Sequence, residues 1–223
     1  MSNEAIATQD STVAVTSKHG MSVFNKLANP SNFLPYVRLY DPSTKECKRG
    51  LIAGGLFGAV KNRKIISLGK QFHCHLLAWR PKALHIPGGE KKPVSYFDPD
   101  SKEFNQALEL CKIKDSGWMA GPEFLICIPD IGYCTFFMSN ATMKNEASNV
   151  IDLVGKVVTF ESKLIETQKY TWYGPETTIC SLPIPALDYN EVETYRQPFL
   201  NPKPSVEEPA EESVPEGAKR AER

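Results

Sequence analysis

Short runs of aromatic and β-branched residues, separated by turn-forming residues, predict that most of the ordered part of this chain is β-sheet. The first run ends at the turn-forming sequence Asp41-Pro42-Ser43, and further turns are expected at residues 61–63 and 130–132. Gly69 predicts a bend within the longest run. The predicted strands cover residues 33–40, 51–60, 64–81, 94–97, 124–129, 133–138, 157–165 and 169–184.

Two segments have helical periodicity instead. In residues 100–112, Asp100 and Glu103 predict a capping box, and the apolar stripe consists of Phe104, Ala107, Leu108 and Cys111. In residues 140–156, Gly155 favours the end of the helix, and the stripe consists of Ala147, Val150, Ile151 and Val154. Because each helix has a single apolar stripe, we expect each to lie on one face of a sheet.

Strands, then a helix, then two more strands is the order of a five-stranded OB barrel, here with an extra helix and hairpin inserted. The sequence therefore predicts a mainly β fold with two helices, built as an elaborated OB-fold-like barrel. Residues 1–30 are polar and weakly patterned and are expected to form a flexible arm, and residues 31–197 form the folded domain. Residues 198–223 are rich in Pro and Glu, a composition that predicts a disordered tail.

Composition limits the compartment and the chemistry. Residues 50–60 form an uncharged stretch that is too short to cross a bilayer as a helix. The N-terminus lacks the pattern of a signal peptide. The six cysteines have no zinc or redox spacing and are expected to be free thiols in a reducing compartment. We expect a cytoplasmic protein, or one of the host cytoplasm if it is viral, with no metal or other cofactor.

Charge is distributed unevenly although the whole chain is neutral, with 26 basic and 26 acidic residues. Residues 38–92 contain twelve basic and three acidic residues, which gives a net charge of +9. Residues 93–203 carry a net charge of −6, and the last twenty residues carry −3. A basic block of this size indicates a polyanionic partner, which points to nucleic acid or a membrane surface.

The segment 72–82 (FHCHLLAWRPK) combines rings and cations within this block. In a regular strand His73, His75 and Trp79 share one face, and Arg80 and Lys82 follow at its end. Flat rings beside cations suit stacking on unpaired bases, with the cations following phosphates. Packing of this face under a helix is the equally weighted alternative, and a metal site lacks an evident third ligand.

Three further groups complete the candidate nucleic-acid site. Tyr170 and Trp172 are predicted to share one strand face, where they either stack on bases or pack in the core. Trp118 lies in the loop 116–122 between two glycines, a pattern that is unusual for a structural role and allows a mobile binding loop as one interpretation. The remaining candidates are the cations at and near the predicted turn, Lys61, Arg63, Lys64 and Lys70.

Enzymatic motifs are weak in this sequence. It contains neither a phosphate-binding P-loop, nor a dinucleotide-binding glycine pattern, nor a serine nucleophile elbow. Glu161 and Lys163, preceded by Asp152, outline a metal-dependent nuclease, but that chemistry needs two converging carboxylates and Asp152 belongs to a predicted helix. We therefore expect a protein without enzymatic activity.

In layout, residues 31–217 resemble the phage-type single-stranded DNA-binding proteins, which have an OB-fold core, a basic groove lined with aromatic residues and an acidic tail. The acidic element is residues 205–217, with five Glu and no basic residue. The resemblance implies a protein that binds and protects single-stranded DNA, largely without sequence preference, in replication or recombination. It also implies that the tail recruits replication or recombination proteins, although the basic ending Lys219-Arg220-Ala221-Glu222-Arg223 departs from that pattern.

The competing hypothesis is a structural or assembly protein, such as a virion or scaffold subunit, whose basic block meets an acidic partner. RNA is an alternative ligand, because stacking platforms accept either backbone. The sequence leaves open whether the chain forms a homo-oligomer.

Overall fold

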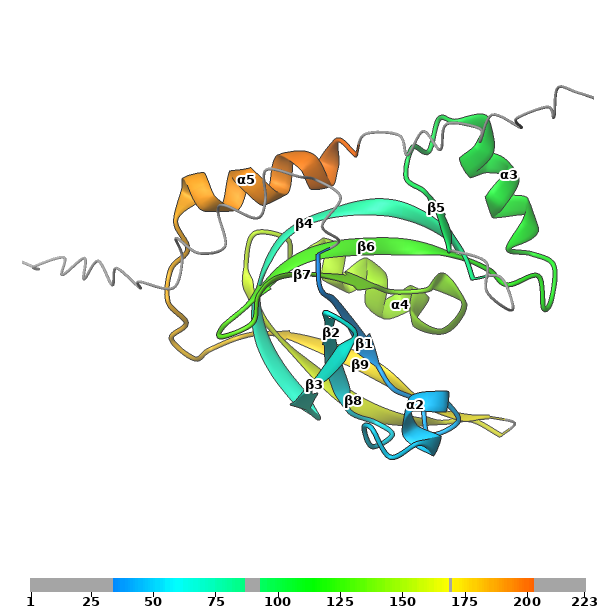
Figure 1. The fold of residues 1–223 in the computed structure, drawn as a ribbon, viewed down its shortest axis with the longest axis horizontal. Helices are drawn as coiled ribbons and strands as arrows, with labels where there is room; N and C mark the ends of the chain where they lie inside the picture. Colours follow the sequence, from blue (N-terminus) through cyan, green and yellow to red (C-terminus); the bar gives the residue numbers. More distant parts are fainter. Residues whose placement is uncertain (1–33, 87–92, 169, 203–223) are drawn as a thin grey trace, which may run out of the picture. The chain divides into compact units, whose positions relative to one another are not determined.

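The computed structural model describes residues 34–86, 93–168 and 170–202, and these form one sheet with helices on both faces (Figure 1). The expected arm at residues 1–30 and the tail beyond residue 202 lie outside the described residues. The strands are β1 Tyr36–Leu39, β2 Phe57–Lys61, β3 Lys64–Gly69, β4 Gln71–His85, β5 Val94–Tyr96, β6 Trp118–Ile128, β7 Gly132–Phe137, β8 Val157–Glu166 and β9 Thr171–Ile179. The helices are α2 Lys45–Lys48, α3 Lys102–Leu110, α4 Asn140–Ile151 and α5 Tyr189–Leu200.

The expectation of a mainly β fold is confirmed, but the predicted strand and helix counts are wrong. The nine strands form a sheet in the order β3-β2-β1-β7-β6-β4-β8-β9, and β5 pairs with the end of β4. Neighbouring strands are antiparallel except β1 and β7. Within the described ranges β3 and β9 are the ends of this path and no ladder joins them, so a closed barrel is not shown.

The long strand β4 organises the sheet, because its two halves pair with different partners. Residues 71–75 pair with β8, and residues 75–85 pair with β6. The predicted strand 64–81 is in fact two strands, since Gly69 has a φ of 80° and ends β3. In Figure 1, β4 arcs over the other strands, which places β6 and β8 at different levels of one curved sheet.

The main hydrophobic core lies on the concave side of this sheet. It joins side chains from β1, β2, β4, β6, β7 and β8 to Ala147 and Val150 of α4. Four phenylalanines pack edge to face or stacked at its centre, with ring centroids 5.0 to 6.2 Å apart: Phe57, Phe72, Phe136 and Phe160. As the sequence predicted, the apolar stripe of α4 covers one sheet face.

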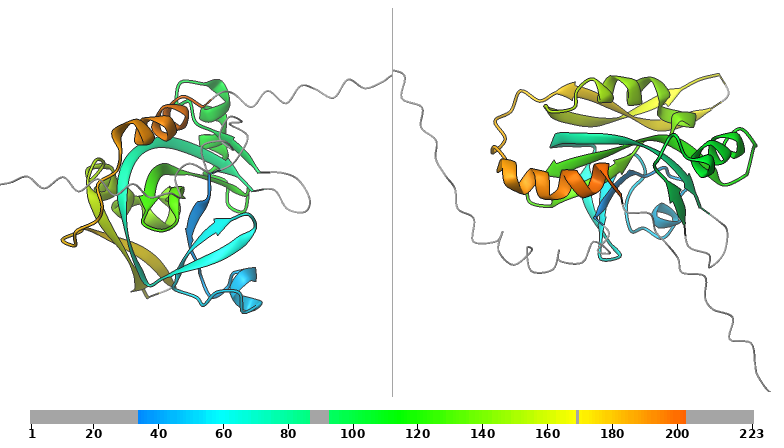
Figure 2. Two further views of the ribbon diagram at one scale, coloured as in Figure 1. Left: turned by 60° about the vertical axis from the view of Figure 1, so that its left-hand side comes forward. Right: turned by 90° about the horizontal axis from the view of Figure 1, so that it is seen from above.

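Helix α5 covers the opposite face: in Figure 1 and in the left-hand view of Figure 2 it lies outside the arc of β4, whereas α4 lies inside it. Asp188 caps its N-terminus by accepting a hydrogen bond from the Glu191 backbone N–H at 2.9 Å. Phe199 is buried against Ala78 and Leu125 in a second core cluster. The domain boundary expected after residue 197 is therefore wrong, since residues 198–200 belong to this docked helix.

The other predicted elements are largely confirmed. Helix α3 buries Phe104 and Ala107, although its N-cap is Ser101 rather than Asp100. Strand β2 occupies only the second half of the predicted strand 51–60. Of the helices in the described ranges, none combines the length and apolarity that crossing a bilayer requires.

Candidate nucleic-acid interface

Eight basic residues between positions 34 and 70 form what we call the basic surface. They lie on β1, on α2 and the residue after it, and on the β2–β3 hairpin and the residue that follows it, and only two acidic residues occur in the same interval. All eight side chains are exposed, and none forms an ion pair with another described residue. They are Arg38, Lys45, Lys48, Arg49, Lys61, Arg63, Lys64 and Lys70.

The tip of the β2–β3 hairpin presents three of these cations. Asn62 and Arg63 have φ values of 50° and 62°, as a two-residue type I′ turn requires. Lys61 and Lys64 are direct cross-strand partners, and Lys61 Nζ donates to the Ile131 carbonyl at 3.5 Å. A turn position that favours glycine is thus filled by arginine, and like charges face each other beside it, which concentrates positive charge at the tip.

A second group of cations surrounds α2, near the other end of β1. Thr44 caps this short helix, its hydroxyl accepting from the Cys47 N–H at 3.5 Å and donating to the Asp41 carbonyl at 2.8 Å. Lys45, Lys48 and Arg49 extend from it into solvent. Since β1 has four residues at a rise of roughly 3.3 Å each, about 13 Å of strand separates the two groups.

Between the two groups β1 contributes an aromatic side chain. Tyr36 is 49% exposed, and it lies two residues from Arg38 on the same strand face. Arg38 lies 5.3 Å from the ring centroid of Tyr40, whose burial raises its pKa to about 12. Tyr36 is the exposed ring of this strand and can stack on a base that the cations hold by its phosphates.

The predicted row of His73, His75 and Trp79 does not exist, because β4 contains a β-bulge. The register with β6 shifts between Leu76 and Ala78, so that Leu77 has no direct partner. His75 pairs with Cys127 on the α5 side, whereas Trp79 pairs with Phe124 on the side of the main core. Trp79 remains 38% exposed, apart from the two imidazoles.

Both imidazoles are engaged by other parts of the protein. His73 Nδ1 lies 2.8 Å from the Thr159 hydroxyl and 3.6 Å from Cys180 Sγ. His75 Nε2 lies 2.9 Å from the Pro185 carbonyl. The segment that connects β9 to α5 therefore contacts both rings, so the two imidazoles are covered by this segment and not by a helix, which was the predicted alternative.

Arg80 and Lys82 also lie on the α5 side, where they share the buried Glu123. Arg80 donates from Nε and Nη2 to one carboxylate oxygen at 2.9 and 2.6 Å, and Lys82 donates to the other at 2.6 Å. The Arg80 guanidinium also donates to the Phe199 carbonyl and lies between the rings of Phe97 and Phe199. Burial lowers the pKa of Arg80, and Glu123 opposes this effect. Arg80 therefore joins the sheet to α5, and Lys82 shares the carboxylate that holds Arg80 in place.

The expectation of a mobile loop at residues 116–122 is wrong, because β6 begins at Trp118. The Trp118 ring stacks between His85, at 4.7 Å, and Tyr96, at 5.9 Å. Tyr96 and Trp118 pack against Ala83 of the sheet and Phe104 of α3 in a third core cluster. The flanking Gly117 is needed for its φ of 75° and not for loop motion.

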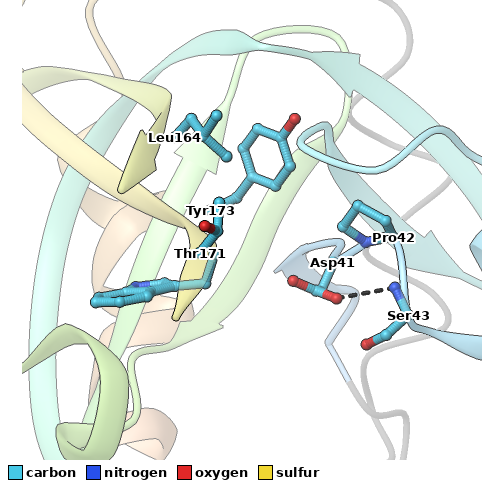
Figure 3. Close-up of a pocket in the computed structure, with 7 residues that line it drawn as sticks. Asp41, Pro42, Ser43, Leu164, Thr171 and Tyr173 are labelled. Carbon is cyan, nitrogen blue, oxygen red and sulfur yellow. Dashed lines mark hydrogen bonds between the residues drawn. The ribbon is translucent and has the colours of Figure 1, made fainter. Parts of the chain in front are cut away.

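The β8–β9 hairpin carries the last two candidates. Tyr170 is 71% exposed at the turn, and its N–H donates to the Thr167 hydroxyl. Trp172 is half-buried and lines an open pocket of about 340 Å³. Figure 3 shows Tyr173 and Leu164 on one side of this pocket, opposite the turn that begins at Asp41.

The described residues contain no group of three or more His, Cys, Asp and Glu side chains that could hold a metal ion. Lys163, from the nuclease-like outline, lies 2.9 Å from Glu161 and 3.4 Å from Glu176 on the neighbouring strand. The three side chains form an exposed cross-strand ion cluster.

Sequence reasoning did not single out the cations of α2, Tyr36 or the pocket. The α2 cations were part of the basic block, but no element was predicted between the turn that ends at residue 43 and the strand that begins at residue 51, so their grouping around a capped helical turn was not predicted. In comparisons with protein-family models, curated proteins and solved structures, nothing matches this chain.

Proposed function

We propose that this protein binds single-stranded DNA through the basic surface and coats and protects unwound strands during replication or recombination. The observation that carries the proposal is that eight exposed cations from one segment have no carboxylate partner among the described residues. Cations left unpaired on a protein surface favour a polyanionic ligand, because phosphate binding releases condensed counterions. The proposed activity needs no catalysis and no cofactor.

Single strands are favoured over duplex by the rings among these cations. Tyr36 is exposed on β1, and Trp172 lines the pocket beside the turn that precedes α2. Stacking of an unpaired base on such a ring contributes roughly 1–3 kcal/mol and is tolerant of sequence. A duplex offers only its phosphates to the same surface.

The structural roles of the other candidates narrow the proposed site. Arg80 and Lys82 are paired with Glu123, so the proposal assigns the phosphate contacts to the eight exposed cations. In this proposal the curved sheet serves as the scaffold for a surface that binds single-stranded DNA, by analogy with OB folds. Residues 205–217 serve in this proposal as the acidic contact for replication or recombination proteins.

The test is a titration of a fluorescently labelled dT oligomer and a duplex of equal length at two salt concentrations. With about five phosphates neutralised, the slope of log K against log salt is roughly −3.5. A fourfold rise in salt then weakens single-strand binding about a hundredfold. Equal or tighter binding to the duplex would contradict the preference for single strands.

A matched pair of charge-reversal variants locates the surface. Changing Lys61, Arg63 and Lys64 to Glu is expected to abolish measurable binding. The control changes Lys102, Lys112 and Lys114 to Glu, which alters the net charge equally at exposed positions in and near α3. If both variants bind equally well, or if the unmodified protein binds neither ligand, the basic surface is a protein contact and the structural or assembly function becomes the better hypothesis.

A further inference from the structure

A pocket of about 340 Å³ lies between the turn after β1 and the β8–β9 hairpin. Pro42, Leu164, Trp172 and Tyr173 form most of its lining, and Asp41 and Ser43 contribute polar atoms. Its volume lies at the small end of the range for ligand sites, about 300–1,000 Å³. A pocket of this size and aromatic character accommodates one flat ring.

Two adjacent glycines fix the walls of the pocket. A Cβ on Gly55 would lie 2.5 Å from a ring carbon of Tyr173, and one on Gly54 would lie 2.5 Å from Cγ of Pro42. Both walls therefore rest directly on the chain between α2 and β2, without room for even a methyl group. Because the pocket is shaped in the free protein, a ligand does not have to order it.

Asp41 gives the pocket a hydrogen-bond acceptor. Its Oδ1 accepts from the Ser43 N–H at 2.8 Å, and hydrogen bonds from Ser43 lower the pKa of the carboxyl group. Figure 3 shows the other carboxylate oxygen directed toward Thr171 across the pocket. An ionised carboxylate accepts hydrogen bonds and donates none, so this wall selects for N–H groups on a ligand.

We infer that this pocket takes one unpaired nucleobase that carries an exocyclic amino group, with cytosine as the simplest case. The inference rests on the proposed function and deepens it. A carboxylate accepts a hydrogen bond from the N4 amino group of cytosine, whereas thymine presents the O4 carbonyl at the same position. A carboxylate that faces the thymine carbonyl is repelled by it. Stacking on the aromatic side chains of the pocket is equally favourable for cytosine and thymine.

The surrounding charge favours a nucleotide over other ligands with amino groups. Lys45, Lys48 and Arg49 lie on and beside α2, which directly follows the turn that lines the pocket. These cations attract the phosphates on either side of the bound base and repel a cationic peptide or amine. The pocket and the basic surface thus form one continuous strand-binding site.

The first test compares dC and dT oligomers of equal length in titrations with the unmodified protein, Asp41→Asn and Glu46→Gln. We expect the unmodified protein to bind dC five- to twentyfold more tightly than dT. Asp41→Asn removes this preference, since an amide also donates to the thymine carbonyl, and Asn is as well suited to the turn as Asp. Glu46→Gln is the matched control, because it removes one negative charge from α2 and leaves the preference unchanged.

The second test uses a protein in which Trp79 and Trp118 are changed to Phe, so that Trp172 is the sole tryptophan. Entry of a base is expected to quench its emission on addition of dC oligomer. Binding of both oligomers without preference and without quenching would overturn the inference while leaving the proposed function intact. Failure to bind any oligomer would overturn both, and equal loss of preference in Glu46→Gln would show a general charge effect and not a carboxylate contact.

Discussion

His75 and Trp79 lie on opposite faces of β4, although a spacing of four residues places two side chains on the same face of a regular strand. The bulge at Leu77 inserts one residue into the register and reverses the alternation beyond it. Each ring on β4 must therefore be judged separately as a stacking platform. His75 is hydrogen-bonded to the chain at Pro185, whereas Trp79 is partly open to solvent.

Trp79→Ala is expected to weaken binding to oligo-dT about tenfold without unfolding the protein, since loss of one stacked base corresponds to roughly 1–3 kcal/mol. His75→Ala is the matched change on the covered face and should leave the affinity unchanged. Fluorescence anisotropy at constant salt measures both, with circular dichroism as the check on folding. An unchanged affinity in folded Trp79→Ala would show that Trp79 does not contact the strand.

Arg63→Gly is expected to separate binding from stability. Arg63 has a φ of 62°, a conformation that costs a residue with a Cβ roughly 1 kcal/mol and glycine almost nothing. The variant should unfold at an equal or higher urea concentration, yet bind single strands more weakly because one cation is lost from the hairpin tip. Its salt slope should fall by roughly 0.7.

Arg63→Lys is the companion variant, since it keeps both the charge and the strain. It should match the unmodified protein in both measurements. Undiminished affinity of Arg63→Gly would show that the hairpin tip does not contact the strand.

Glu123→Ala is expected to destabilise the fold by about 3–5 kcal/mol, because it leaves Arg80 and Lys82 as unpaired cations in a nearly buried site. Urea unfolding followed by circular dichroism measures the change. Glu109→Ala is the control, since Glu109 pairs with Lys112 on the exposed face of α3 and should contribute at most about 0.5 kcal/mol. Similar losses in the two variants would mean that the buried cluster does not anchor α5.

Gly55→Ala is expected to be markedly more destabilising than Gly50→Ala. The two glycines have φ values of 77° and 71°, so backbone strain is nearly the same in both variants. Only the Cβ at position 55 meets a neighbour, the Tyr173 ring at 2.5 Å, whereas position 50 is open. We expect the contact to add roughly 1–3 kcal/mol, as overpacking does elsewhere.

Thermal unfolding of Gly55→Ala and Gly50→Ala measures the difference in destabilisation between the two variants. Combining Gly55→Ala with Tyr173→Leu should recover part of the loss, because the ring that the new methyl group meets is then absent. Equal destabilisation of the two single variants would contradict the close packing that shapes the pocket.

Stability should fall as the pH rises from about 9 towards 12. Burial raises the pKa of Cys134 from 9.0 to about 12 and the pKa of Tyr40 from 10.0 to about 12. The unfolded chain loses these protons first, so the stabilisation is complete below pH 9 and is lost as the pH approaches the folded-state values. Each group contributes up to about 1.4 kcal/mol per pH unit in this range.

Urea midpoints at pH 7, 9, 10 and 11 measure this dependence. Cys134→Ala should reduce the change of the urea midpoint with pH. Its midpoint at pH 7 is expected to be lower as well, because the substitution leaves a cavity in the core. Cys47→Ala is the control, because Cys47 is a half-buried thiol in α2, a helix that contributes no buried residue to the core. A midpoint that does not change between pH 9 and 11 would contradict burial of these groups.

Local signals in the sequence determined the positions of most elements. The turn at residues 61–63, the hairpin around Asp130 and both amphipathic helices follow from residue chemistry within a few positions, and all of them occur in the structure. The excess of basic residues between positions 38 and 92 was likewise evident from the sequence.

Only the tertiary structure decided which face each candidate side chain occupies. The bulge at Leu77 arises from pairing with β6, a strand some fifty residues away, and nothing in the local sequence encodes it. Arg80 and Lys82 share the buried carboxylate of Glu123, and Arg80 also contacts Phe199 of α5, whereas Lys61, Arg63 and Lys64 have no carboxylate partner among the described residues. A cation's availability depends on which distant carboxylate the fold brings within hydrogen-bond reach, so the sequence determined the charge of this protein and the fold determined where that charge is free to act.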